Sequence, residues 1–254
     1  MPAIAAACIF GALIAINLAS RSQIPDPNDP LSSTMSADVL AKNLTAASDF
    51  VNERSMRGEI STDEGRELLS EYAKNLTSAI DLKDIDKANA WRYGDLFRTG
   101  RQWKMGKAAY QLAVSKPATE DRRVNDTLRL AQCMAELGEV SEAIETARKV
   151  FDAEPKQSAP IPPAVLLEIA PPARGKGFDR ELAQLLVDAS EKHLTVVVDP
   201  KKAEAVAFKY AQPHHIKNAM KLAAKLYEDL DDGAAVVRTL EKLDSMVRDN
   251  KVVR

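Results

Sequence analysis

Two neighbouring stretches of the chain decide its fold. Residues 90–117 read AWRYGDLFRTGRQWKMGKAAYQLAVSKP, and residues 127–155 read TLRLAQCMAELGEVSEAIETARKVFDAEP. Gly94 and Ala131 lie 37 residues apart, and the same distance separates Gly106 from Ala143. Large and small residues follow one another in the same order in both stretches. The two stretches are therefore predicted to be copies of one structural unit.

The spacing within each copy predicts a pair of antiparallel helices. Gly94 and Gly106 are twelve residues apart, as are Ala131 and Ala143, which places one small residue on each helix of a hairpin. Helices approach closely where small residues meet, so we expect the two small residues of each copy to face each other. Such a hairpin cannot bury its apolar face alone and must stack on a neighbour.

A third, partial copy lies near the C-terminus. Ala223 and Ala235 follow Ala131 and Ala143 at a constant offset of 92 residues. The third copy predicts that the helical hairpins continue towards the end of the chain.

Two other regions depart from the repeat. In residues 161–194, the first helix is expected to be interrupted by Pro160, Pro162, Pro163, Pro171 and Pro172. Residues 36–81 lack the small-residue pattern, but residues 61–64 (STDE) form a capping box between two amphipathic segments. We expect these two segments to pack as an N-terminal hairpin.

The repeat pattern resembles the tetratricopeptide repeat family. The resemblance is good for residues 87–117 and 124–155 and partial for residues 216–249. It implies an all-α fold, an α-solenoid of antiparallel helical hairpins, in which the first helix of each pair lines a concave surface. The resemblance also implies that the protein binds a protein or peptide and is not an enzyme.

Composition restricts the function further. The formal net charge of the chain is -2, without the basic surplus of a nucleic-acid-binding protein. The only cysteines are Cys8, in an apolar run, and Cys133, in a predicted helix, which excludes a disulfide framework.

The N-terminus predicts a membrane segment. Residues 1–19 carry no charged side chain, and nineteen helical residues span about 28 Å, just enough to cross a bilayer core. We interpret residues 1–20 as an apolar helix that serves as a signal anchor; a cleaved signal peptide and a buried core helix are the alternatives. Residues 21–35 contain three prolines and predict a stiff linker.

These observations predict an order of segments along the chain. The segments are a signal anchor or signal peptide (1–20), a proline-rich linker (21–35), an N-terminal helical hairpin (36–81), tetratricopeptide-like repeats (82–157), an irregular helical repeat (158–200) and a C-terminal hairpin with its cap (201–254). The protein is predicted to be anchored in a membrane with its body on the extracytoplasmic, periplasmic side. The alternatives are an exported soluble protein and a body that faces the cytoplasm.

Residues on two predicted first helices are candidates for binding a partner on the concave face. They are Trp91, Asp95, Arg98, Arg129, Gln132 and Glu136. An aromatic side chain with nearby arginines is the composition of a binding hot spot. Alternatively, Trp91 is core between repeats and the charges form a solvated face. Asp95 and Gln132 stand where domains that grip a C-terminal carboxylate carry asparagines, so that ligand is not expected.

No catalytic residue, metal site or cofactor is predicted. His214 and His215 are adjacent at an expected helix start, and adjacent residues point about 100° apart on a helix, which does not suit metal ligation. Residues 174–177 (RGKG) could receive an anion at a helix N-terminus but lack the spacing of a phosphate-binding loop.

The sequence therefore predicts a membrane-tethered, non-catalytic scaffold or adaptor of the cell envelope that binds a protein or peptide. The first alternative is a structural subunit of a larger membrane-associated complex. The second is an enzyme or ligand-binding protein on a helical scaffold.

Overall fold

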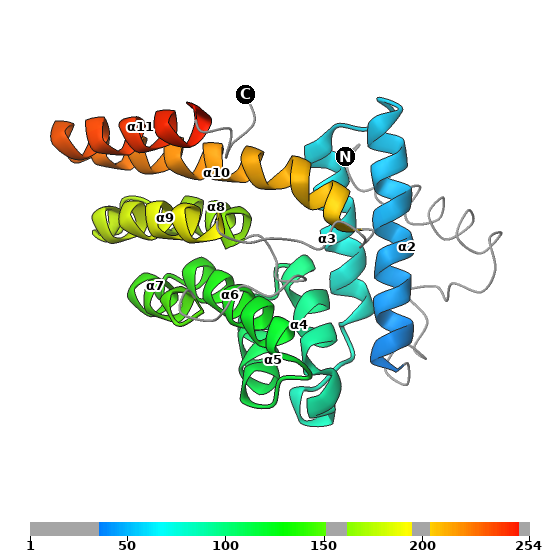
Figure 1. Cartoon of the computed structure of the whole chain (residues 1–254). Coiled ribbons are helices and arrows are strands. Elements are labelled where there is room, and N and C mark those ends of the chain that lie inside the picture. The colour runs from blue at the N-terminus through cyan, green and yellow to red at the C-terminus, as the bar shows by residue number, and fades with distance from the viewer. Residues whose placement is uncertain (1–35, 151–161, 195–203, 249–254) are drawn as a thin grey trace, which may run out of the picture. The chain divides into compact units, whose positions relative to one another are not determined.

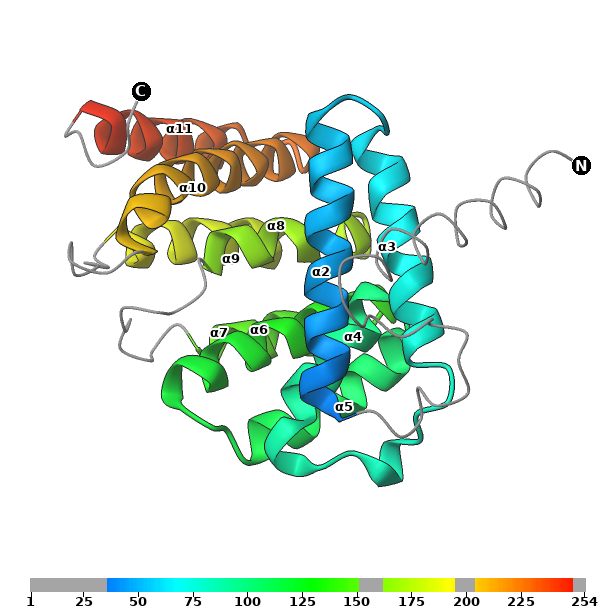
Figure 2. The same ribbon diagram turned by 90° about the vertical axis from the view of Figure 1, so that its right-hand side faces the viewer.

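The computed structural model describes residues 36–150, 162–194 and 204–248. Within these ranges the chain forms ten α-helices, two short 3-10 turns and no strand, which confirms the predicted all-α class. The chain divides into two compact units, Met1–Leu112 (unit 1) and Ala113–Arg254 (unit 2). Figures 1 and 2 show the helices in two views.

Unit 1 contains two helical pairs. Its elements are α2 (Ala37–Met56), α3 (Thr62–Leu76), the 3-10 turns Leu82–Asp84 and Lys87–Asn89, α4 (Ala90–Thr99) and most of α5 (Trp103–Ser115). Helices α2, α3 and α4 all pack against one another. Their core contains the buried side chains of Leu40, Ala47, Tyr72, Leu76 and Leu96.

The turn between α2 and α3 follows the sequence prediction. Gly58, just after the end of α2, has a φ of 71°, a conformation that glycine adopts without strain. The Ser61 N–H donates to Glu64 Oε2 at 2.8 Å, and the Glu64 N–H donates to Ser61 Oγ at 3.1 Å. The predicted capping box is therefore confirmed, and it fixes where α3 begins.

The close contact between α4 and α5 differs from the one that we expected. A Cβ built on Gly94 would meet three atoms of the Tyr110 ring at 2.7–2.9 Å, and these are the nearest atoms to it. The small residue on α4 thus faces a large ring on α5, and not Gly106. Tyr110 is fully buried, and its hydroxyl donates to the Asp95 carboxylate at 2.5 Å. The absence of a Cβ at Gly94 therefore leaves space for the Tyr110 ring, which is held in place by its hydrogen bond to Asp95.

Unit 2 consists of three helical pairs. They are α6 (Glu120–Glu136) with α7 (Val140–Arg148), α8 (Pro162–Ala173) with α9 (Asp179–His193), and α10 (Glu204–Asp229) with α11 (Gly233–Arg248). Both views show these pairs in successive layers, with α8/α9 between the other two (Figures 1 and 2). Helix α8 packs against α6, α9 and α10. One continuous apolar core runs through all three layers, from Val124 to Met246.

Alanines occupy the predicted small-residue positions of unit 2. Ala131 and Ala223 are fully buried, and so is Ala143, while Ala235 is 4% exposed. Side-chain caps are present at the starts of two helices of unit 2. The Arg122 N–H donates to Thr119 Oγ1 at 3.1 Å, and the Ala235 N–H donates to Asp232 Oδ1 at 3.0 Å.

The expected interruption of the helix in residues 161–194 was wrong. Pro171 and Pro172 both lie inside α8. They fall in its last turn, where they remove the N–H donors for only the Leu167 and Glu168 carbonyls. Burial of α8 between three other helices of unit 2 compensates for these lost hydrogen bonds.

The prediction of a membrane-anchored protein must be corrected. None of the helices in residues 36–150, 162–194 and 204–248 combines the length and the apolar character needed to cross a bilayer. The predicted anchor (1–20) and linker (21–35) lie outside the described residues. The apolar character of residues 1–19, on which the predicted anchor depended, is shared by segments other than membrane anchors.

Candidate functional site

Three of the six predicted partner-binding residues lie on α4 in unit 1. Trp91 is partly buried, and the Arg92 guanidinium carbon lies 4.2 Å from the centre of its ring. Arg92 Nε also lies 2.7 Å from Asp38 Oδ1 on α2. The Asp95 carboxylate accepts the Tyr110 hydroxyl, and Arg98 is partly buried. Trp91 and Asp95 thus both contact side chains of their own unit.

A shallow depression of about 410 Å³ lies beside this group, along α2. Its lining residues are Asp38, Ala41, Lys42, Thr45, Ala46, Asp49 and Arg92. Two acidic and two basic side chains line it, so it carries no net charge that would select an ionic ligand. None of the six predicted residues is among its lining residues.

The other three predicted residues lie on α6 in unit 2. Arg129 Nη1 donates to Gln132 Oε1 at 3.1 Å and to Glu168 Oε2 on α8 at 2.7 Å. The Arg129 side chain is only 18% exposed, whereas that of Glu168 is 45% exposed. Glu136, at the end of α6, is exposed. The structure therefore joins Arg129 and Gln132 to each other and to the neighbouring helical pair.

Helix α10, which packs against α8, also carries polar side chains. Burial lowers the pKa of His215, and the nearby His214 lowers it further, while the Glu168 carboxylate opposes both effects. The His214 and His215 rings are 5.5 Å apart, and His214 Nε2 lies 3.0 Å from Asn218 Nδ2. Polar groups thus extend from α6 over α8 to α10. We call Gln132, Arg129, Glu168, His215 and His214 the polar row.

His193 lies at the end of α9, below the polar row in the core. Its side chain is buried, with 3% of the residue exposed. Burial lowers its pKa to about 4, with a smaller contribution from the charge of His215. His193 is therefore neutral at pH 7, and burial of a neutral imidazole is compatible with the apolar core around it.

Sequence reasoning did not place Glu168, His214 or His215 in a site. The two histidines were expected at a helix start after Pro213, but α10 begins at Glu204 and carries Pro213 inside it. Glu168 lies in the segment that was expected to be broken. These residues can be recognised as neighbours only when the packing order of α6, α8 and α10 is known. No local sequence motif indicates that order.

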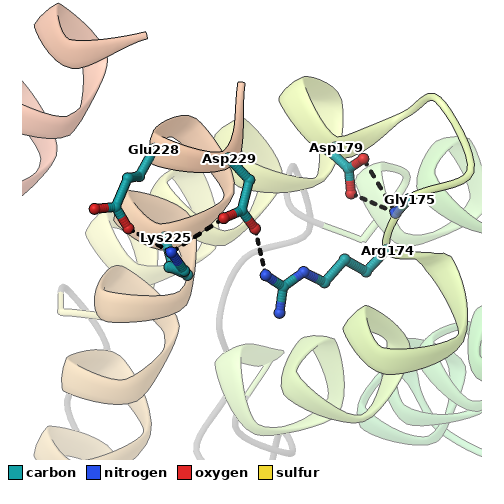
Figure 3. A network of polar contacts seen from close by, with 6 residues as sticks. All are labelled: Arg174, Gly175, Asp179, Lys225, Glu228 and Asp229. Atoms are coloured by element: carbon teal, nitrogen blue, oxygen red, sulfur yellow. Dashed lines mark hydrogen bonds and ion pairs between the residues drawn. The ribbon is translucent and has the colours of Figure 1, made fainter. Parts of the chain in front are cut away.

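The basic glycine loop does not offer a free anion site at its first glycine. The Gly175 N–H donates to both carboxylate oxygens of Asp179, at 2.9 and 3.1 Å (Figure 3). Arg174 pairs with Asp229 on α10, which also lies 3.1 Å from Lys225 Nζ (Figure 3). The loop thus connects α8 to α9 and attaches them to α10.

Within the described ranges, no three or more His, Cys, Asp or Glu side chains are placed to hold a metal ion. Comparison with protein-family models, with curated proteins and with solved structures finds no match. The site must therefore be interpreted from its own geometry.

Proposed function

We propose that this protein is a non-catalytic helical-repeat scaffold that binds a segment of another protein along the polar row. The observation that carries this proposal is the bond from Arg129 on α6 to Glu168 on α8, together with the packing of α8 against α10, the helix that carries His214 and His215. In a stack of helical pairs, the first helices present one extended surface, and such surfaces are used for binding.

The packing of unit 2 supports an α-solenoid arrangement. Its first helices pack in order, α6 on α8 and α8 on α10, and the second helices α7 and α9 also pack together. This is the neighbour-to-neighbour pattern of a repeat stack, in which each layer contacts only the next. The finer resemblance to the tetratricopeptide repeats remains part of the proposal.

The chemistry of the row suits recognition better than catalysis. Arg129 is fixed by two acceptors, and fixed arginines are favoured where binding requires defined hydrogen-bond geometry. The lowered pKa of His215 favours a neutral imidazole, which can both donate and accept a hydrogen bond.

Site-specific photocrosslinking tests the proposed function. A photoreactive residue replaces Lys221, exposed on first helix α10, in one variant and Glu145, exposed on second helix α7, in the control. Irradiation of the full chain in a lysate of its source cells should give a discrete protein adduct from position 221 and none from position 145. Equal adducts from both positions, or none from position 221, would contradict the proposal.

A further inference from the structure

Only one of the three guanidinium nitrogens of Arg129 donates hydrogen bonds within the described part of the chain. Both of its described hydrogen bonds, to Gln132 and to Glu168, start from Nη1. Within the described part of the chain, Nε and Nη2 donate to no acceptor, and neither atom is among the buried side-chain nitrogens. One end of the fork is thus anchored, and the side chain keeps 18% of its surface exposed.

That open edge has a specific shape. The Nε–H and one Nη2–H of a guanidinium are parallel and match the two oxygens of a carboxylate. Because Gln132 and Glu168 already fix the plane of Arg129, a ligand would not have to order this side chain, which lowers the entropic cost of binding.

Arg101 in unit 1 provides a contrast. It also bridges two helical pairs, but its Nη2 and Nη1 both donate to Glu67, at 2.7 and 3.1 Å. Both oxygens of the Glu67 carboxylate thus pair with the Nη1–Nη2 edge of Arg101. Arg129 gives its own carboxylate partner only one nitrogen, so the Arg101 pair is bidentate and the Arg129 pair is not.

We propose that the Nε–Nη2 edge of Arg129 binds an acidic side chain of the partner segment that lies on the polar row. This inference rests on the proposed function and adds the chemistry of the partner. The partner's carboxylate and Glu168 would then bind Arg129 from different edges of its guanidinium. Polar groups of the partner that flank this carboxylate would bind near His214 and His215 on α10.

Peptide selection followed by substitution tests the proposal. Random dodecapeptides displayed on phage without a free C-terminus are selected on the full chain. Enriched peptides should carry an acidic residue, and replacing Glu by Gln in the synthetic peptide should weaken binding about tenfold, as measured by fluorescence anisotropy. The Arg129→Gln variant should bind the Glu and Gln peptides equally, whereas Arg101→Gln, the matched control, should bind like the parent protein.

Arg129→Lys guards against a variant that fails to fold. It keeps the positive charge but lacks the fork, so it should discriminate between Glu and Gln less than the parent protein does and more than Arg129→Gln does. Enriched peptides that bind without any dependence on acidic residues, or on Arg129, would overturn this inference while leaving the scaffold function intact. A dependence on the free C-terminal carboxylate of the synthetic peptide would also overturn it. Failure to enrich any peptide, together with no photocrosslink at position 221, would count against both proposals.

Discussion

The two units bring their helices together with different small residues. In unit 1, glycines lie at the contacts. A Cβ on Gly65 would come within 2.8 Å of Val51 Cγ1, and one on Gly94 within 2.7 Å of the Tyr110 ring. In unit 2, a Cβ on Gly138, Gly175, Gly177 or Gly233 would meet no atom within 4 Å. Buried alanines fill the interior there, and unit 1 buries alanines as well, among them Ala73 and Ala90.

These two kinds of contact predict how each unit responds to substitutions that add or remove side-chain atoms. A glycine contact allows helices or rings to approach without a Cβ between them, but it leaves no room for an added atom. An alanine contact keeps a methyl group in the core and favours the helical conformation. Unit 1 should therefore be sensitive to added atoms, and unit 2 should be sensitive to lost ones.

The largest effect is expected from Gly94→Ala. The added methyl group would meet the Tyr110 ring, which is fully buried and held by Asp95, so neither side can move easily. We expect a destabilisation of about 3 kcal/mol. Chemical denaturation followed by tryptophan fluorescence reports it, since Trp91 and Trp103 both lie in unit 1. An unchanged denaturation midpoint would show that unit 1 is not limited by this contact.

Acid should weaken unit 2 selectively, because all three histidines lie in it. The pKa of His193 falls from 6.5 in the unfolded chain to about 4 in the folded one. Its contribution to stability is complete above pH 6.5 and is lost as the pH falls towards 4. Between pH 7 and pH 5 we expect a loss of about 2 kcal/mol.

The variant His193→Leu separates this histidine from the carboxylates that also titrate in acid. Its stability, measured by circular dichroism, should fall less between pH 7 and pH 5 than that of the parent protein. The tryptophan signal of unit 1 serves as the internal control. A variant with the same pH dependence as the parent would rule out His193 as the cause.

Helix caps in unit 1 should have a smaller effect. Ser61→Ala removes half of the capping box and should cost about 1 kcal/mol. Ser36→Ala, at the start of α2, is the matched comparison. Its hydroxyl accepts from the Val39 N–H at 3.4 Å, a longer contact without a reciprocal partner. A larger loss at Ser36 than at Ser61 in thermal melts would contradict this ranking.

The smallest effect is expected from Gly233→Ala, and it has the opposite sign. Gly233 begins α11 with open space around its Cβ position. Alanine there should stabilise the protein by roughly 0.5 kcal/mol through its lower backbone entropy in the unfolded chain. The same substitution thus has opposite outcomes at Gly94 and Gly233, and equal outcomes in thermal melts would remove the distinction between the units.

Much of the secondary structure could be predicted from local signals. The turn at residues 57–61 and the caps at Thr119 and Asp232 follow from side chains within a few residues of each helix end. Local signals failed where tertiary packing decided the outcome. Pro171 and Pro172 lie inside α8 because three other helices of unit 2 bury it.

The candidate site was less accessible from the sequence. Arg129 and Gln132 share a helix, so their spacing of three residues already indicated that they are neighbours. Glu168 and His215 come from other layers, and which residues meet across layers depends on the register of stacking. Similarly, the repeat identified Gly94 as a contact residue but did not identify the Tyr110 ring as the group that it faces.

The ion pairs between the helical pairs of unit 2 have a consequence for how these pairs are oriented on one another. They are Arg129–Glu168, Arg174–Asp229, Arg180–Asp232 and Lys242–Glu191. Partly exposed pairs of this kind contribute little free energy, and the apolar core alone is not directional. Charged anchors at the ends and edges of the helices act at a distance from the core, where they oppose rotation of one layer on the next. Added salt should therefore loosen the packing of one helical pair of unit 2 on the next well before it lowers the melting temperature.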